Sequence, residues 1–204
     1  MKITSIQAQI KRSNRYSIFV DGTFTFGLST DALLESKITV GQEVTEADIK
    51  RFRRLSDDDK AYGLALAYVA RRLRSEWELR DYCKRKGYED ELTNSILAKL
   101  ADYGFVDDAM FAKRWVESRR MLKATSVKKL RLELRQKRIA DDIISEVLAE
   151  DETDERQVLR DLVEKKRRQT KYQDKQKLMM YLAGQGFNYD DIKAVLADEG
   201  AESY

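Results

Sequence analysis

Three stretches of the chain, beginning at Ser75, Ser126 and Asp174, share one pattern of apolar and polar positions. In each stretch, two apolar residues four positions apart predict the buried stripe of a helix, and further apolar residues follow at a break and eight positions later. The aligned sets are Leu79, Leu130 and Leu178; Cys83, Leu134 and Leu182; Tyr88, Ile139 and Phe187; and Ile96, Val147 and Val195. Because Tyr68, Trp115 and Leu162 also recur at intervals of 47, the pattern predicts repeated units of three helices in about 48 residues.

Residues that begin and end helices fall at matching places in these units. Ser75 followed by Glu78 is the pattern of a capping box, in which each side chain bonds the other residue's backbone N–H. Gly87 and Gly186 lie where the end of a helix favours a left-handed backbone. The second repeat has Arg138 at this position, which predicts a small conformational penalty there.

Other positions complete the predicted helices and their core. Asp174 and Asn188 are expected to be N-caps, since their side chains can accept a hydrogen bond from the first turn. The apolar and aromatic positions of the units, Trp77 and Trp115 included, are expected to belong to the core.

The first 56 residues show a different period, because apolar residues alternate with polar ones as in half-buried strands. The expected strands contain Tyr16, Ile18 and Val20; Phe24, Phe26 and Leu28; and Ile6, Ala8 and Ile10. Asp21-Gly22 predicts a two-residue hairpin turn between the first two of these. Short helices are expected near residues 29–36 and 45–55, with a junction at Asp57–Asp59 and a new helix that begins near Lys60.

The sequence therefore predicts a mainly α protein with three tandem three-helix-bundle repeats in an elongated crescent. A small N-terminal module, a β-hairpin with short helices, precedes the repeats. The expected boundaries are 1–56 for this module, then 57–107, 108–155 and 156–204 for the three repeats.

Composition excludes several kinds of chemistry. The 204 residues include no histidine and one cysteine, Cys83. Imidazole catalysis, a histidine metal ligand and an internal disulfide are therefore excluded. No apolar run approaches the ~18–20 residues of a membrane span, and the N-terminus has no signal-like stretch. We expect a cytoplasmic, non-membrane protein that is not an enzyme and holds no metal or cofactor.

Charge is distributed in blocks although the formal net charge is only +3. Residues 71–86 contain seven basic and three acidic side chains, residues 113–138 eleven and two, and residues 156–177 nine and three. Acidic blocks at 89–108, 141–155 and 190–202 lie between and after them. Three basic–acidic cycles favour a repeated unit with a polarised surface, and the plain alternative is that charged helices solvate their outer faces.

Three ordered sets of short motifs occur along the repeats, together with a shorter fourth one. They are Arg74-Ser75, Glu78-Leu79-Arg80-Asp81-Tyr82 and Lys86-Gly87-Tyr88; Gly104-Phe105-Val106-Asp107-Asp108, Phe111-Ala112, Trp115-Val116 and Ser118-Arg119; Leu130, Glu133-Leu134, Lys137 and Ile139; and Leu182 with Gly186-Phe187. Through these motifs the chain resembles the RecX family of bacterial regulators of the RecA recombinase. The resemblance spans about residues 60–198, and the hairpin is similar to that of longer, Gram-positive-type members. Ala124-Thr125 and Arg138 stand where the family usually has glycine.

The resemblance implies a monomer that binds RecA filaments on single-stranded DNA, in the filament groove, and binds DNA itself weakly and without specificity. Such a protein modulates, and mainly inhibits, the ATPase, strand-exchange and co-protease activities of RecA, and so regulates recombinational DNA repair and the SOS response. The residues expected to contact the filament are Arg71, Arg72, Arg119, Arg120, Lys128, Lys129, Arg131, Arg135, Lys165, Lys166, Arg167 and Arg168.

Three other interpretations stay open. The carboxylate pairs Asp107-Asp108 and Asp141-Asp142 could bind a metal or transfer protons, but both lie at predicted helix starts, where negative charge is favourable. The helix containing Lys128–Lys137 could enter a DNA groove, as in homeodomain-like folds. A repeat array can also be a scaffold for other proteins.

Overall fold

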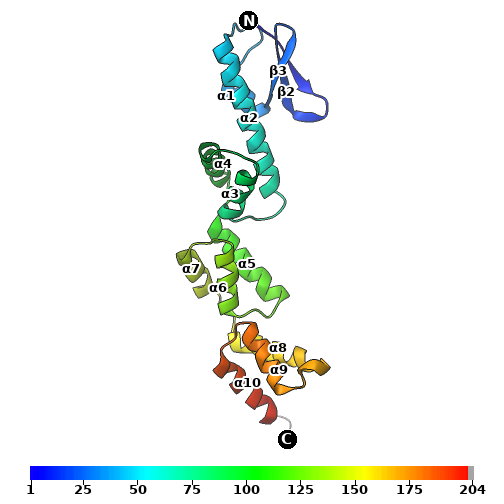
Figure 1. Cartoon of the computed structure of the whole chain (residues 1–204), viewed down its shortest axis with the longest axis vertical. Helices are drawn as coiled ribbons and strands as arrows, with labels where there is room; N and C mark the ends of the chain where they lie inside the picture. The colour runs from blue at the N-terminus through cyan, green and yellow to red at the C-terminus, as the bar shows by residue number, and fades with distance from the viewer. Residues whose placement is uncertain (202–204) are drawn as a thin grey trace. The chain divides into compact units, whose positions relative to one another are not determined.

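The computed structural model (Figure 1) describes the backbone of residues 1–201, and the side chains of all of these except residues 12, 13 and 199–201. The chain divides into two compact units, residues 1–72 with 79–105 and residues 73–78 with 106–204. The strands are β1 (Ile3–Gln9), β2 (Arg12–Val20) and β3 (Thr23–Ser29). The helices of the first part are α1 (Thr30–Ser36), α2 (Glu46–Val69), α3 (Glu76–Arg85) and α4 (Asp90–Asp102). They are followed by α5 (Asp108–Leu122), α6 (Val127–Gln136), α7 (Asp141–Ala149), α8 (Glu155–Arg167), the 3-10 turn η1 (Thr170–Tyr172), α9 (Lys175–Gly184) and α10 (Tyr189–Ala201).

The N-terminal module is an antiparallel sheet of three strands in the order β1-β2-β3, as the alternation predicts. Asp21 and Gly22 both have positive φ, 46° and 81°, which is typical of the two-residue turn that favours a hairpin. Phe26 and Leu28 are buried against α2, whereas Phe24 is 55 % exposed. The placement of Ile10 in a strand is wrong, because β1 ends at Gln9 and Ile10 lies fully exposed in the turn.

The prediction of a break at Asp57–Asp59 is also wrong, because α2 is one helix of 24 residues. It begins at a capping box formed by Thr45 and Asp48 rather than near Lys60. Asp57–Asp59 resembles the acidic start of a helix, but in the structure it lies inside α2, where the charge of Asp59 is balanced. The carboxylate of Asp59 forms an ion pair with Arg15 at 3.1 Å and accepts the Ser29 N–H at 2.9 Å.

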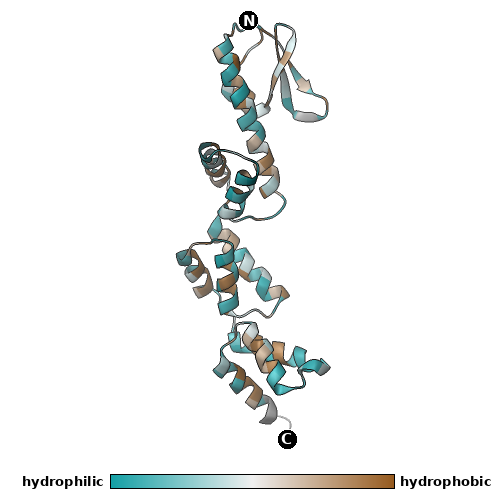
Figure 2. Cartoon of the chain, viewed as in Figure 1, coloured by the Kyte–Doolittle hydropathy of each residue, from teal (hydrophilic) through white to brown (hydrophobic). Residues whose placement is uncertain are grey.

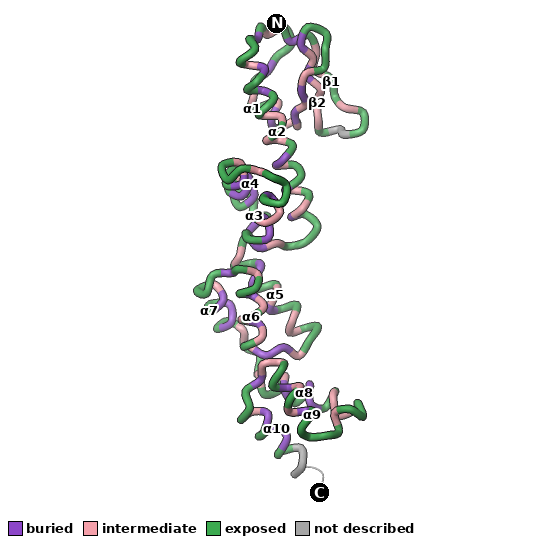
Figure 3. Tube along the Cα trace, in the orientation of Figure 1, coloured by how far each residue is buried: buried purple, intermediate pink, exposed green. Residues whose placement is uncertain are grey.

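The aligned apolar positions form the cores of the repeats, as the sequence predicts. In the second unit, one cluster joins α5, α6 and α7 around Leu130 and Leu134, and another joins α8, α9 and α10 around Leu178 and Leu182. All four leucines have no exposed surface. Figure 2 shows apolar stretches beside polar ones on the helices of these repeats, and Figure 3 shows that the same helices carry buried stretches.

The second helix of each repeat ends in the same way. In each turn a backbone carbonyl accepts a hydrogen bond from the N–H five residues later: Cys83 from Tyr88 at 3.1 Å, Leu134 from Ile139 at 3.2 Å, and Leu182 from Phe187 at 3.3 Å. The residue before each of these has positive φ: 76° at Gly87, 59° at Arg138 and 89° at Gly186. The predicted left-handed positions are therefore confirmed, including the one occupied by arginine.

Two aromatic positions differ in burial. Trp77 was expected in the core but is 43 % exposed, because it lies two positions from Leu79 and so on the other side of α3. Trp115 is half-buried and stacks on Phe111 with ring centroids 5.7 Å apart. Cys83 is fully buried, and burial raises the pKa of its thiol.

The carboxylate pairs lie where helices begin. Asp107 is the N-cap of α5 and accepts the Met110 N–H at 2.9 Å, and Asp141 and Asp142 occupy the first turn of α7. Asp174 and Asn188 also accept first-turn N–H groups, from Lys177 at 3.0 Å and from Asp190 at 3.4 Å. The carboxylate pairs therefore have a structural explanation, since they lie at helix starts, where negative charge is favourable.

Candidate interaction surfaces

Two of the predicted contact residues on α5 are held by ion pairs within the fold. The guanidinium of Arg119 is 2.6 Å from Glu133 and lies over the Trp115 ring at 4.5 Å. Arg120 is 2.6 Å from Asp151 and donates a second bond to the Thr125 carbonyl at 2.6 Å. The side chains of Arg120 and Asp151 are only 11 % and 9 % exposed, so this pair joins the end of α5 to the segment that follows α7.

Helix α6 carries the cations of the proposed recognition helix, but most of them bind within the second unit. The contacts are Lys129 to the Gln185 amide oxygen at 2.6 Å, Arg131 to the Ser145 hydroxyl at 3.2 Å, Arg135 to Asp141 at 2.8 Å and Lys137 to Glu78 at 2.8 Å. Lys128 is exposed. Lys129 and Lys137 are therefore held by part-buried contacts within the fold, which does not favour a homeodomain-like mode in which they read base edges.

The third repeat carries its predicted cations around two tyrosines. Lys166 lies over the rings of Tyr172 and Tyr181, at 5.3 and 4.7 Å. Arg167 donates to the Gln173 carbonyl at 2.8 Å and Arg168 pairs with Glu164 at 2.6 Å, whereas Lys165 is exposed. This basic block is thus ordered by aromatic rings and carbonyl oxygens of its own repeat.

Arg71 and Arg72 belong to the first unit and follow the end of α2, where both are exposed.

Exposed cations remain in the second unit after these internal contacts. Within the described side chains, those with no carboxylate within ion-pair distance include Lys123, Lys128, Arg138, Lys165, Lys171, Lys175 and Lys177. Lys128 and Lys165 were among the predicted residues, but Lys123, Arg138 and the lysines at 171–177 were missed. The charge blocks contain all seven, but charge alone does not distinguish a free cation from one paired across the fold.

The N-terminus of a helix is bound in the same way twice within the second unit. At the start of α3, the Ser75 hydroxyl donates to the Lys137 carbonyl at 3.1 Å and the Glu76 N–H to Asp108 at 2.8 Å. At the start of α6, the Ser126 hydroxyl donates to the Gln185 carbonyl at 2.8 Å and the Val127 N–H to Glu155 at 2.9 Å. Each of these helix starts is bound by two groups of one repeat: the carbonyl at the end of the second helix and the carboxylate at the start of the first helix. We call this pair of groups a socket.

Burial and hydrogen bonds shift the pKa values of two carboxylates in the second unit, Asp108 and Asp151. Removal from water raises the pKa of Asp108, although the Glu76 N–H works in the opposite direction. For Asp151, burial also acts to raise the pKa, but hydrogen bonds from Thr153 and Arg120 outweigh it and the pKa is lowered. Asp151 is therefore held in its charged form.

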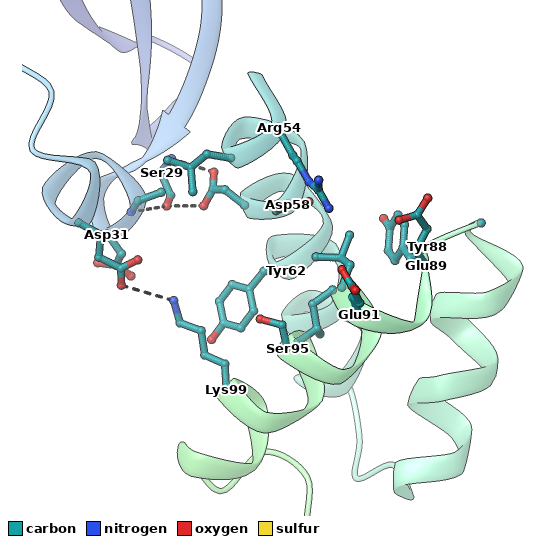
Figure 4. Close-up of a pocket in the computed structure, with 17 residues that line it drawn as sticks. Ser29, Asp31, Arg54, Asp58, Tyr62, Tyr88, Glu89, Glu91, Ser95 and Lys99 are labelled. Atoms are coloured by element: carbon teal, nitrogen blue, oxygen red, sulfur yellow. Dashed lines mark hydrogen bonds and ion pairs between the residues drawn. The ribbon is translucent and has the colours of Figure 1, made fainter. Parts of the chain in front are cut away.

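The first unit contains a groove of about 650 Å³ between α1, α2 and the start of α4 (Figure 4). Its carboxylates outnumber its cations: Asp31, Glu35, Asp58, Asp59, Glu89 and Glu91 against Arg54 and Lys99. Lys99 pairs with Glu35 at 3.7 Å and lies over the Tyr62 ring at 4.7 Å. Burial raises the pKa of Asp58. No sequence motif indicated this groove, because its residues come from three separate helices.

The described residues contain no group of three or more His, Cys, Asp or Glu side chains placed to hold a metal ion. In the same part of the chain, no helix combines the length and apolar character needed to cross a bilayer.

Comparison with protein families finds four matches in chain order. Residues 1–45 match the "Regulatory protein RecX N-terminal domain". Residues 61–100, 107–148 and 153–196 match the first, second and third three-helix domains of RecX.

Curated relatives and solved structures agree with these matches. "Regulatory protein RecX" of Bacillus velezensis is 30 % identical over 199 residues, which cover 95 % of this chain and 76 % of the relative. The protein of the same name from Bacillus licheniformis is 30 % identical, with 98 % and 80 % covered. A crystal structure of regulatory protein RecX matches with a TM-score of 0.79 at 25 % identity, covering 96 % of this chain and 98 % of the other. The structure of RecX from Lactobacillus salivarius gives 0.61 at 27 % identity, over 70 % and 96 %.

Proposed function

This chain belongs to the RecX family of regulatory proteins, and on that premise we propose that it regulates RecA by binding the RecA filament on single-stranded DNA. The family supports a regulator of RecA in general. The proposal adds that the second and third repeats contact the filament groove, and that binding mainly inhibits the ATPase, strand-exchange and co-protease activities. Recombinational repair and the SOS response would be affected through RecA.

The observation that carries the proposal is the set of exposed cations in the second unit, Lys123, Lys128, Arg138, Lys165, Lys171, Lys175 and Lys177, which have no carboxylate partner among the described residues. Unpaired cations on a surface are available for phosphate groups or for acidic protein surfaces. Arg120, by contrast, is committed to Asp151 and serves the fold.

A regulator of this kind needs no chemical step of its own. It changes RecA activity by binding one state of the filament more tightly than another, and the shift cannot exceed that difference in affinity. The location we propose for the protein is the cytoplasm, where its partner acts.

The test measures RecA ATPase and strand exchange on single-stranded DNA with substoichiometric amounts of the protein. Wild type should inhibit both, and the double variant Lys128→Glu/Lys165→Glu should need at least tenfold more protein for the same inhibition. The matched control is Lys50→Glu/Lys60→Glu, which reverses two exposed lysines of α2 in the first unit. An absence of any effect of wild type on its cognate RecA would refute the proposal, and equal inhibition by the two variants would refute the assignment of the surface.

A further inference from the structure

The two occupied sockets have a third counterpart in the first unit. Helix α3 ends with the same hydrogen-bonded turn as α6 and α9, and this places Lys86 in register with Lys137 and Gln185. The carbonyls of Lys137 and Gln185 each accept a serine hydroxyl. Within the described residues, the Lys86 carbonyl accepts no such bond, and Lys86 and Gly87 are exposed.

The acidic groove of the first unit lies beside the C-terminal end of α3. Gly87, Tyr88 and Glu89 line it together with Asp58 of α2 (Figure 4). In the second unit, the carboxylate of each occupied socket, Asp108 or Glu155, is the first residue of its helix. Helix α2 instead continues past this point towards its N-terminus, so Asp58 offers a carboxylate from the helix interior.

We propose that the groove and the Lys86 carbonyl form a third socket, which binds the N-terminus of a helix from a partner protein. The helix begins with Ser or Thr, whose hydroxyl donates to the carbonyl, as Ser75 and Ser126 do in the second unit. Its free first-turn N–H groups and the positive end of its dipole face carboxylates.

Charge selects the rest of the partner's first turn. Two of the six carboxylates are paired, Asp59 with Arg15 and Glu35 with Lys99. The other four face only one lining cation, Arg54, and this excess of negative charge favours Lys or Arg there. The occupied socket at Gln185 already receives a helix whose first turn carries Lys128 and Lys129. A partner helix with acidic residues in its first turn would be repelled.

A second copy of this chain is not the occupant that the geometry favours. The corresponding helix start in the third repeat is that of α9, and its N-cap is Asp174. A carboxylate has no hydroxyl hydrogen to donate, and it would face the Lys86 carbonyl oxygen unfavourably. The start of α9 therefore does not fit the first-unit socket, and the occupant we favour is another protein.

The experiment uses a defined probe: an N-acetylated, lactam-bridged peptide of residues 126–137 with a C-terminal fluorophore, added to the full chain without RecA or DNA. The bridge holds the helix, since short helices are unstable alone. Fluorescence anisotropy should show saturable binding. A peptide with Ser126→Ala should bind at least fivefold more weakly, and the protein variant Asp58→Lys/Glu89→Lys at least tenfold more weakly.

The matched control is the protein variant Asp102→Lys/Glu152→Lys, which makes the same change in net charge at exposed positions outside the groove. Circular dichroism checks that each protein is folded, and Glu89→Lys alone replaces the double variant if the latter unfolds. The proposal is overturned if the peptide binds the groove variant and the control variant equally, or if Ser126→Ala in the peptide does not weaken its binding. Because RecA is absent, this outcome is independent of the proposed regulation of RecA.

Discussion

The hydroxyl of Ser126 and the carbonyl of Gln185 are joined by a hydrogen bond of 2.8 Å, although 59 positions separate them in the sequence. The same hydroxyl oxygen accepts the Lys129 N–H at 3.1 Å, so one side chain caps α6 and also meets the end of α9. The negative end of one helix thereby faces the positive end of another. This contact connects the second and third repeats through polar groups of the helix ends.

Replacing Ser126 with alanine should destabilise the second unit by about 1–3 kcal/mol, because an N-cap bond is lost and the part-buried carbonyl of Gln185 loses its donor. Urea unfolding followed by circular dichroism measures the change. Ser118→Ala, at an exposed position of α5, is the control and should change stability by less than ~0.5 kcal/mol. A loss for Ser126→Ala no larger than that of the control would contradict the structural role of the contact.

The left-handed turns of the second and third repeats predict opposite responses to substitution. Gly186 has φ of 89°, and a Cβ there would lie 2.6 Å from the Ser126 hydroxyl oxygen, so Gly186→Ala should cost more than the ~1–2 kcal/mol of a left-handed residue. Arg138→Gly removes such a penalty at φ of 59° and should stabilise by up to about 1 kcal/mol. Thermal melts of the two variants, with Arg138→Ala as the control that keeps the strain, check this. Stabilisation by Gly186→Ala would contradict the left-handed backbone and the close approach to Ser126 at this turn.

Local and periodic features of the fold could be predicted from the sequence. The stripe of Leu130 and Leu134 and the left-handed positions at Gly87 and Gly186 depend on neighbours in the chain, and both are confirmed. The continuity of α2 could not be predicted, because the charge of Asp59 is balanced by Arg15, which lies on strand β2 and is distant in the sequence.

The candidate surfaces show the same division. The basic blocks are visible in the sequence, but which cations are free depends on partners such as Asp151 for Arg120 and Glu78 for Lys137. Asp151 follows the end of α7 and Glu78 lies on α3, so the two partners are 31 and 59 positions away in the sequence. The groove in the first unit has no signal in the sequence for the same reason.

The largely buried ion pair of Arg120 and Asp151, with side chains 11 % and 9 % exposed, predicts a dependence of stability on pH. Because the pKa of Asp151 is lowered in the folded chain, its contribution is present above the unfolded pKa of about 3.9 and is lost as the pH falls through the folded value. Asp151→Asn should therefore cost about 3 kcal/mol near neutral pH, since it leaves Arg120 buried without its counter-charge. The difference between wild type and variant should shrink below about pH 4.

Denaturant unfolding at a series of pH values measures this difference. Asp141→Asn is the control, because the pKa of Asp141 is also lowered, by its bond to Arg135, but this pair is exposed and should contribute little. A difference for Asp151→Asn that is constant from neutral to acidic pH would mean that the carboxylate does not titrate as the geometry requires.

The exposed cations of the second unit predict weak DNA binding in the absence of RecA. Binding should weaken steeply with salt, because each cation that neutralises a phosphate releases counterions. For single-stranded DNA the slope of log K against log salt should fall in magnitude by about 0.7 for each contacting cation removed. Lys128→Glu/Lys165→Glu should therefore bind more weakly at low salt with a shallower slope, whereas Lys50→Glu/Lys60→Glu should leave the slope unchanged. Anisotropy of labelled oligonucleotides of several sequences provides the measurement, and binding that is tight, selective for one sequence and insensitive to salt would instead favour base reading by α6.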